Sequence, residues 1–427
     1  MHFHKQPPAV PRFKGSLQMY NIGFIHIHIG YNIPTELMVL FNIRRKAMHC
    51  KTLINIIGKY NHYSILAAFN LRPEKIVFVR LKEDWESFEN AKACIGARFP
   101  DIKLEEQVLS QQCPLELSEI LRQYDSEDVF LNLSGGSKLM SLLTFQAALG
   151  SKMTLIYIDS DKGQILWLGK TVEVLCPIQA ELTVEDIVYS TGAEIIKHST
   201  EVYEKKEFKE LVEFLVENYD MWKLVKDILR HSYYVNQFVM QPFLIEILSD
   251  RLTYLQMKAM EKFLQELSAK RLISSYIFYY DHIEFTFSSR EAKAFVMTIG
   301  CWLEALTYRC IKEINEVSNA ISGMLFVWDE ELEVHNELDV VAAVGSHLVS
   351  ISCKDTANYD VAELNELEVY AEHLGGRKVT KILVSTHLPE RGEMICQRAE
   401  EMGIHLVIFN GNLKSFKNEL HQLIVQK

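Results

Sequence analysis

The chain has 427 residues, of which 48% are hydrophobic and 24% are charged, and this is enough apolar material for two or three domains with packed cores. Its formal net charge of -11 argues against a protein that coats nucleic acid by bulk electrostatics, so any such contact needs a local basic patch or a bound metal ion. The eight cysteines are scattered without a C-x-x-C pair. This usage is typical of free thiols in a reducing cytoplasm and not of a zinc knuckle.

The first 47 residues differ from the rest of the chain. MHFHKQPPAVPRF is broken by prolines, and the following apolar stretch contains histidine, asparagine, proline and glutamate. The segment lacks the apolar core of a secretory signal, and no uninterrupted apolar run approaches the length of a membrane span. We expect residues 1–47 to be a poorly ordered extension and expect no membrane partner.

Strands alternate with helices from residue 48 to about residue 198. TLINIIG, KIVFVRL and DVFLNLS predict buried strands, and each is followed by a helical pattern. This alternation predicts a parallel, doubly wound sheet. MTLIYID and QILWLG then predict two strands joined by a tight turn.

A glycine-rich loop stands where one of these strands gives way to a helix. In FLNLSGGSKLMSLL, the strand is followed by Ser134, two glycines, Ser137 and Lys138. Ligands of open α/β sheets bind at such strand ends, where backbone N–H groups and the helix dipole attract phosphate. The Walker pattern is absent, which disfavours a nucleotide triphosphatase. A second loop, beginning Gly58-Lys59, leaves the first strand in the same way; the two loops together favour phosphate binding over a pair of simple turns.

The pattern from about Phe208 to Ser268 is helical, with apolar residues at helical spacing. LQMKAMEKFLQELSAKRLI followed by SSYIFYYDHIEFTF then predicts a helix and a two-stranded wing, with Asp281-His282 at the turn. This is the signature of a winged-helix unit, which either reads DNA or braces a dimer. Its cations are interspersed with acids, which favours bracing.

The C-terminal part predicts a small α/β layer. A helix over Glu291–Val317 is followed by three strands, LFVWDEELEVHN, LDVVAAV and HLVSISC, and then by helix, strand, helix and strand. Gly345-Ser346 is predicted to form a two-residue hairpin turn between the second and third strands, with glycine first as a type II′ turn requires.

That turn places four polar side chains on one face of the hairpin. With Val344 opposite His347, pairing outward sets Asp339 opposite Ser352 and Glu337 opposite Lys354. Side chains two residues apart share a face, so these four project together, although a slip of one residue would separate them.

Two carboxylates and an ammonium at one end of a hairpin suit metal-dependent phosphodiester cleavage, because carboxylates hold Mg²⁺ or Mn²⁺ and the ion activates water. The alternative is a solvated Glu–Lys pair across two strands. Glu304 favours the nuclease interpretation: it lies in an apolar helical stripe in GCWLEALTYRCIKEI, where a carboxylate needs a partner such as Lys354 or metal-bound water. The alternative is that Glu304 forms a buried ion pair without any catalytic role.

The SGGSK loop, the later LTVEDIVYSTGAEI, and the series WLEALTY, NELDVV and ISCKD together resemble CRISPR-associated ancillary nucleases. These proteins join a CARF ligand-sensing domain to a PD-(D/E)xK endonuclease domain. The resemblance covers the chain from about Met48 to its C-terminus. It implies a Rossmann-like CARF domain at 48–198, a helical, winged-helix-like connector at 199–290 and a restriction-endonuclease-like α/β domain at 291–427.

The resemblance also implies a homodimer that binds a cyclic oligoadenylate, usually cyclic tetra-adenylate, and then cleaves DNA or RNA in type III CRISPR antiviral defence. The residues that it places around the cyclic ligand are Gly58, Lys59, Asn132, Ser134, Gly135, Gly136, Ser137 and Lys138. The residues that it places in the nuclease centre are Glu304, Asp339 and Lys354, with Mn²⁺ or Mg²⁺ as the ion and the Cys353 carbonyl as a further ligand.

One position departs from the family pattern. The acid of (D/E)xK is replaced by Ser352, which weakens metal binding unless another carboxylate substitutes for it. Our hypothesis is that Glu337 or Glu304 completes the coordination.

Two other functions remain open from the sequence. In a ligand-responsive DNA-binding regulator, the winged helix would read DNA and the nuclease centre would be inactive because of Ser352. In a constitutive repair-type nuclease, cleavage would not depend on the cyclic ligand.

Overall fold

The structure is a computed structural model that describes residues 50–298, 300–328, 335–390 and 392–425. The predicted extension at 1–47 lies outside the described residues. Among the described residues, no single helix is long and apolar enough to cross a membrane. Helices α11 (Arg290–Met297) and α12 (Cys301–Lys312) reach that length only together, as a bent pair, and their apolar side chains lie in the protein core.

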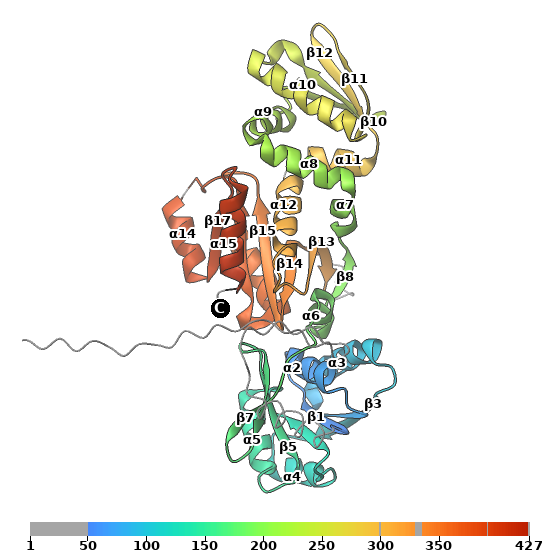
Figure 1. Ribbon diagram of the computed structural model, residues 1–427, viewed down its shortest axis with the longest axis vertical. Coiled ribbons are helices and arrows are strands. Elements are labelled where there is room, and N and C mark those ends of the chain that lie inside the picture. Colours follow the sequence, from blue (N-terminus) through green and yellow to red (C-terminus); the bar gives the residue numbers. More distant parts are fainter. Residues whose placement is uncertain (1–49, 299, 329–334, 391, 426–427) are drawn as a thin grey trace, which may run out of the picture. The chain divides into compact units, whose positions relative to one another are not determined.

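The first domain is built on a sheet of seven strands in the order β3-β2-β1-β4-β5-β6-β7 (Figure 1). Strands β1 to β5 are parallel, as predicted, and β6 and β7 run antiparallel at one edge. Every residue of β1 is buried, which is typical of parallel strands covered on both faces. The elements are β1 (Thr52–Ile56), α2 (His62–Leu71), β2 (Lys75–Leu81), α3 (Trp85–Arg98), β3 (Lys103–Leu109), α4 (Pro114–Arg122), β4 (Val129–Asn132), α5 (Lys138–Ala147), β5 (Thr154–Asp159), β6 (Gln164–Leu168) and β7 (Val172–Pro177).

The middle of the chain forms helices and a second, antiparallel sheet in the order β11-β12-β10-β9. Its elements are α7 (Thr200–Glu204), α8 (Lys206–Glu217), α9 (Tyr219–Arg230), β9 (Val235–Phe238), β10 (Gln241–Leu248), α10 (Tyr254–Ala269), β11 (Ile273–Phe278), β12 (His282–Phe287) and α11. The predicted helix and wing are present as α10, β11 and β12. The helical prediction for Phe208 to Ser268 is wrong at β9 and β10: short apolar runs do not distinguish strand from helix by periodicity, and β10 is fixed as a strand by pairing with β12.

The C-terminal domain has a mixed sheet in the order β17-β16-β15-β14-β13-β8. Its elements are α12, β13 (Asn319–Val327), β14 (Asn336–Val344), β15 (His347–Lys354), α13 (Val361–Gly375), β16 (Thr380–Ser385), α14 (Gly392–Glu401), β17 (Ile404–Ile408) and α15 (Leu413–Val425). The helix predicted over Glu291–Val317 is divided, because Gly300 at the start of α12 has φ +98°, a conformation that interrupts a helix. The strand predicted in LFVWDEELEVHN begins earlier, at Asn319, and residues 329–334 lie outside the described residues.

The edge strand β8 (Glu194–Lys197) reaches the C-terminal sheet from far along the chain. It pairs antiparallel with β13, matching Lys197 to Leu325. The sheet therefore groups β8 with the C-terminal domain, although the sequence placed it inside the sensor range of 48–198.

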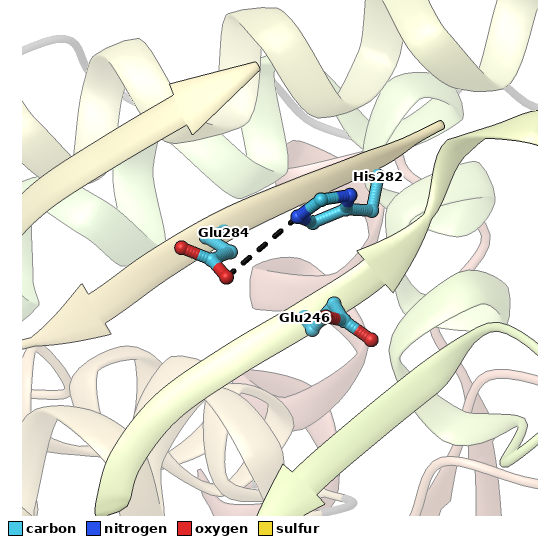
Figure 2. Close-up of side chains that lie close together, drawn as sticks. All are labelled: Glu246, His282 and Glu284. Atoms are coloured by element: carbon cyan, nitrogen blue, oxygen red, sulfur yellow. Dashed lines mark ion pairs between the residues drawn. The ribbon is translucent and has the colours of Figure 1, made fainter. Parts of the chain in front are cut away.

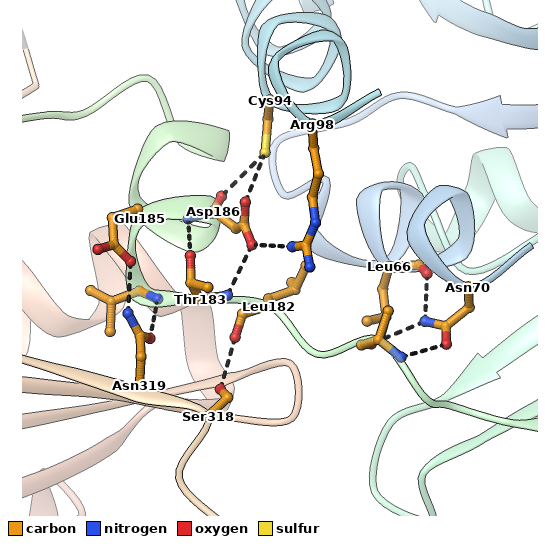
Figure 3. Close-up of polar contacts among 12 residues, drawn as sticks. Leu66, Asn70, Cys94, Arg98, Leu182, Thr183, Glu185, Asp186, Ser318 and Asn319 are labelled. Carbon is orange, nitrogen blue, oxygen red and sulfur yellow. Dashed lines mark hydrogen bonds and ion pairs between the residues drawn. The ribbon is translucent and has the colours of Figure 1, made fainter. Parts of the chain in front are cut away.

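The segment before β8 contacts both domains through α6 (Val184–Ser190), as Figure 3 shows. Thr183 and Asp186 cap this helix reciprocally. Toward the first domain, Asp186 accepts a hydrogen bond from Arg98 of α3 at 3.1 Å. Toward the C-terminal domain, the side-chain oxygen of Asn319 accepts from the Val184 N–H at 2.8 Å.

A buried ion network joins α9 to the end of the central strand β15. Asp355 is 1% exposed and accepts hydrogen bonds from Lys226 (2.6 Å), the Trp302 indole (2.7 Å) and the Thr386 hydroxyl (2.6 Å). Arg230 pairs with its second oxygen. Burial alone would raise the pKa of Asp355, but Lys226 and Arg230 outweigh it and lower that pKa.

Replacing Asp355 tests this network. In Asp355→Ala, the buried Lys226 and the half-buried Arg230 of α9 lose their counter-charge, and we expect the free energy of unfolding to fall by roughly 3–5 kcal/mol in urea titrations. The matched control is Asp220→Ala, which removes an exposed ion pair with Lys223 on the same helix and should have little effect. Equal effects of the two substitutions would contradict a structural role for the network.

Candidate active site

The carboxylate of Asp339 lies where β14 and β15 separate. The hairpin has the predicted register, with Val344 opposite His347, and its ladder ends at Val340 opposite Ile351. Beyond that pair, Asp339 Oδ2 accepts the backbone N–H of Cys353 at 2.6 Å and the Ser352 hydroxyl at 3.3 Å. The carboxylate of Asp339 thus accepts the Cys353 N–H, which has no backbone partner in β14 because the two strands separate here.

Glu304 approaches the same place from α12. Its Oε2 accepts a hydrogen bond from the Tyr203 hydroxyl at 3.0 Å. A Cβ atom built on Gly300 would lie 3.5 Å from Glu304 Oε1 and 3.9 Å from the Cys353 carbonyl oxygen. Gly300 therefore keeps side-chain atoms away from both oxygens.

Electrostatic interactions connect the predicted residues. Burial, followed by the negative charges of Asp339 and Glu337, raises the pKa of Glu304 to about 8, and Lys354 opposes this shift. Burial also raises the pKa of Asp339, while Lys354 and the Cys353 N–H oppose the increase. Asp339 and Glu337 thus act on Glu304, and Glu337 acts on Asp339, beside one ammonium group. This local excess of negative charge favours a cation.

The structure brings together most of the predicted nuclease residues. Glu304, Asp339 and Lys354 interact electrostatically, and Glu337 acts on the first two although it is exposed. The Cys353 thiol is buried against Thr307, so only the carbonyl of Cys353 is a candidate ligand. Ser352 contributes a hydrogen bond to Asp339 instead of a carboxylate.

The donor set fits Mg²⁺ or Mn²⁺. Two carboxylates and a backbone carbonyl supply oxygen ligands, which these ions prefer. The raised pKa of Glu304 means that ionisation of this carboxyl group is unfavourable unless a cation binds beside it.

Sequence reasoning missed two residues that support this site. Tyr203 lies in the short helix α7, with no motif to identify it, and its hydroxyl holds Glu304. Asp355 follows Lys354 directly in the motif ISCKD, and this position next to a predicted site residue is the sequence feature that could have identified it. Because Asp355 binds both α9 and Trp302 of α12, it fixes the ends of the elements that carry Lys354 and Glu304.

The two predicted ligand loops of the first domain touch through their backbones. A Cβ on Gly58 would lie 2.8 Å from Gly136 Cα, and one on Gly135 would lie 2.2 Å from the Ile56 carbonyl oxygen. Any larger residue at Gly58 or Gly135 would force the loops apart. The structure thus joins the β1–α2 and β4–α5 loops at the carboxyl ends of parallel strands.

The side chains around these loops divide into two groups. Asn132 is fully buried, where it donates to Asn55 Oδ1 at 3.0 Å and accepts the Ser134 N–H at 3.0 Å, so it supports the loop from beneath. Ser134 accepts the Ile158 N–H at 2.6 Å, and Ser137 caps α5 by accepting from Met140 N. The side chains of Lys59 and Lys138 are exposed and are available to an anionic ligand.

Comparison with known proteins relates the C-terminal part of the chain to an endonuclease family. Residues 290–425 match the family described as Card1-like, endonuclease domain. No curated protein sequence matches the chain.

Two solved structures share its fold over most of their length. Protein VC1899 from Vibrio cholerae has a TM-score of 0.67 and 18% identity, covering 87% of this chain and 97% of its own. Can2 from Sulfobacillus thermosulfidooxidans, in complex with cyclic tetra-adenylate, has a TM-score of 0.62 and 18% identity, covering 88% of this chain and 98% of its own. The α/β architecture inferred from the sequence is thus confirmed, and the C-terminal third of the chain is similar to Card1-like endonuclease domains.

Proposed function

We propose that this protein is a metal-dependent endonuclease, activated by a cyclic oligoadenylate, that cleaves DNA or RNA in type III CRISPR antiviral defence. The observation that carries the proposal is the convergence of Glu304, Asp339 and Lys354 inside a Card1-like endonuclease domain. The joined glycine loops of the first domain, in a fold shared with Can2 bound to cyclic tetra-adenylate, support the activator.

In the proposed reaction, Asp339, Glu304 and the Cys353 carbonyl would hold Mn²⁺ or Mg²⁺, and Glu337 would supply the negative charge that the missing acid at Ser352 does not. An ion bound there would supply activation of a water molecule and compensation of the negative charge on the phosphate. The Lys354 ammonium stabilises the charge that develops on the phosphodiester. The Tyr203 hydroxyl orients Glu304 by its hydrogen bond.

A homodimer is supported by an apolar stripe on α5, the helix that begins at the SGGSK loop. Leu139, Leu142 and Phe145 are spaced along one face of α5 and are 53%, 66% and 39% exposed. Leu149, just beyond α5, and Leu115 of the neighbouring α4 are 64% and 76% exposed. Contiguous exposed apolar groups mark interaction surfaces, and two copies packed on this stripe would bring both glycine loops to one ligand with matching symmetry.

Coupling between the ligand loops and the nuclease domain is supported by direct contacts. Tyr60, two residues after Gly58, donates a hydrogen bond to the Glu372 carbonyl of α13 at 3.4 Å. Asp161, in the turn between β5 and β6, pairs with Lys378 after α13 at 2.9 Å. Since α13 packs on β15, movement at the loops would be transmitted to the strand that carries Lys354.

The decisive experiment incubates the purified protein with cyclic tetra-adenylate, Mn²⁺ and labelled single-stranded DNA or RNA. Cleavage that requires the ligand supports the proposal. Cleavage that ignores it indicates a constitutive nuclease, and specific duplex binding without cleavage indicates a regulator.

Substitutions in the site should separate catalysis from folding. Asp339→Ala and Lys354→Ala should each reduce ligand-activated cleavage by about 100-fold or more, because they remove the ion's ligand or the charge on the phosphate. The control is Glu393→Gln, an exposed acid on α14 of the same domain, which should cleave normally. If Glu304→Ala and Glu337→Ala both retained full Mn²⁺-dependent cleavage, the assignment of a substitute for the missing acid would be wrong.

The pH dependence of metal binding follows from the pKa of Glu304. Below its pKa of about 8 the carboxyl carries a proton that the metal must displace, so Mn²⁺ affinity should rise with pH by up to roughly tenfold per unit and level off above it. Calorimetric titration between about pH 6 and pH 9 measures this. The rise should be much smaller in Glu304→Gln, which has no proton to lose, and a flat profile in the unmodified protein would contradict the assignment.

A charged substitution on the apolar stripe of α5 tests the proposed dimer interface. Leu142→Glu places a carboxylate in the proposed interface and should convert a dimer into a monomer in size-exclusion chromatography with light scattering. Leu388→Glu, at a position 68% exposed in the C-terminal domain, is the control and should remain dimeric. A dimer that survives Leu142→Glu would exclude this face as the interface.

A further inference from the structure

A second group of metal-ligand side chains lies in the connector, outside the nuclease domain. Strands β10 and β12 pair antiparallel with Glu246 opposite Glu284 and Leu248 opposite His282. His282 and Glu284 are two residues apart and therefore share a face of β12 with Glu246 as their cross-strand neighbour. One ligand atom from each of the three side chains lies within 4.8 Å of the others (Figure 2).

This face is the outer face of the sheet, and the opposite face is core. Ile245, Ile247, Ile283 and Phe285 alternate with the three polar residues and are buried. The polar side chains are half-buried, with His282 and Glu284 at 24% and 33% exposure. The register that buries the apolar residues thus also fixes the polar cluster, since a slip by one residue would reverse both faces.

The cluster places like charges directly opposite each other. Carboxylates at directly paired positions of an antiparallel sheet repel and destabilise the pairing. Glu284 forms an ion pair with His282, in which Glu284 Oε1 lies 3.6 Å from His282 Nε2. Glu246 accepts a hydrogen bond from the side-chain amide of Asn236 at 2.6 Å. A divalent cation between the two carboxylates would turn this repulsion into attraction.

The imidazole of His282 is held in an orientation that suits a ligand. Its Nδ1 lies 2.8 Å from Asp281 Oδ1, and its ring stacks on Tyr279 with centroids 4.4 Å apart and planes 15° apart. When Nδ1–H donates to Asp281, the lone pair of neutral histidine is on Nε2, the atom that faces Glu284. A carboxylate that fixes a histidine by its second nitrogen is the usual support of a metal-bound imidazole.

We propose that Glu246, His282 and Glu284 form a divalent transition-metal site, with Zn²⁺ as the fitting ion, that clamps β10 to β12 in the connector. One imidazole nitrogen and two carboxylate oxygens are ligands that Zn²⁺ accepts, whereas Mg²⁺ and Ca²⁺ prefer oxygen alone. Asp281 is a positioning residue that orients His282. The site is independent of the nuclease centre and does not rest on the proposed function.

The test uses the full chain carrying Asp339→Ala, so that the nuclease centre does not obscure the result. After removal of metal at pH 8, Zn²⁺ titrated against a chromogenic chelator should bind with one ion per chain. Glu246→Gln and His282→Ala, each added to this background, should weaken binding by at least roughly tenfold, and Asp281→Asn should weaken it less. Glu261→Gln, on the exposed face of α10, is the matched control and should bind normally.

Two further readouts separate the site from the alternatives. Glu246→Gln removes the repulsion, so it should leave the thermal unfolding of the metal-free protein unchanged or raise its midpoint, while abolishing the increase that Zn²⁺ produces. Co²⁺ bound at the site should give a spectrum without a thiolate charge-transfer band, which excludes binding by the free cysteines. Unchanged Zn²⁺ affinity in both Glu246→Gln and His282→Ala, or binding that follows the thiols, would overturn the proposal and leave His282 as an ion-pair partner of its neighbouring acids.

Discussion

The geometry of the candidate active site depends on the separation of β14 and β15 beside Asp339. While two strands remain paired, their backbone donors are used by the ladder. Where the ladder ends, at Val340 and Ile351, the Cys353 N–H becomes available and Asp339 takes it. The same segment carries Lys354 and the Cys353 carbonyl, whose oxygen would lie, like Glu304 Oε1, within 4 Å of a Cβ built on Gly300. A hydrogen bond of 2.6 Å thus fixes the carboxylate around which the other charged groups gather.

A surplus of negative charge has to be stabilised by the rest of the domain. The surroundings disfavour ionisation of Glu304 and Asp339, and one residue beyond Lys354 lies Asp355, a fully buried carboxylate with a full set of donors. The contrast between the neighbouring acids separates two roles. Asp355 is satisfied within the protein and is structural, whereas Asp339 and Glu304 retain unmet demand for positive charge, which is typical of a functional site.

The sequence predicted those features whose causes lie close together along the chain. The turn at Gly345-Ser346 determined the register of the hairpin, and Gly345 has the positive φ, +61°, that the turn requires. Buried parallel strands were evident as continuous apolar runs. Features that depend on distant partners were not predictable: β10 is a strand because β12 pairs with it, and Tyr203 matters because it meets Glu304, 101 positions away. No local sequence pattern predicts the β10–β12 pairing or the Tyr203–Glu304 hydrogen bond.

The position of β8 has a consequence for how such proteins can be recombined. The segment from Leu182 to Lys197 bonds with Gly345, Ser318 and Asn319 and completes the C-terminal sheet. A chimera that pairs this C-terminal domain with a foreign N-terminal domain should therefore be joined in the short stretch between the end of β7 at Pro177 and Leu182. A junction placed after Lys197 would supply a mismatched edge strand, and a C-terminal fragment beginning there would expose the flank of β13 to other chains.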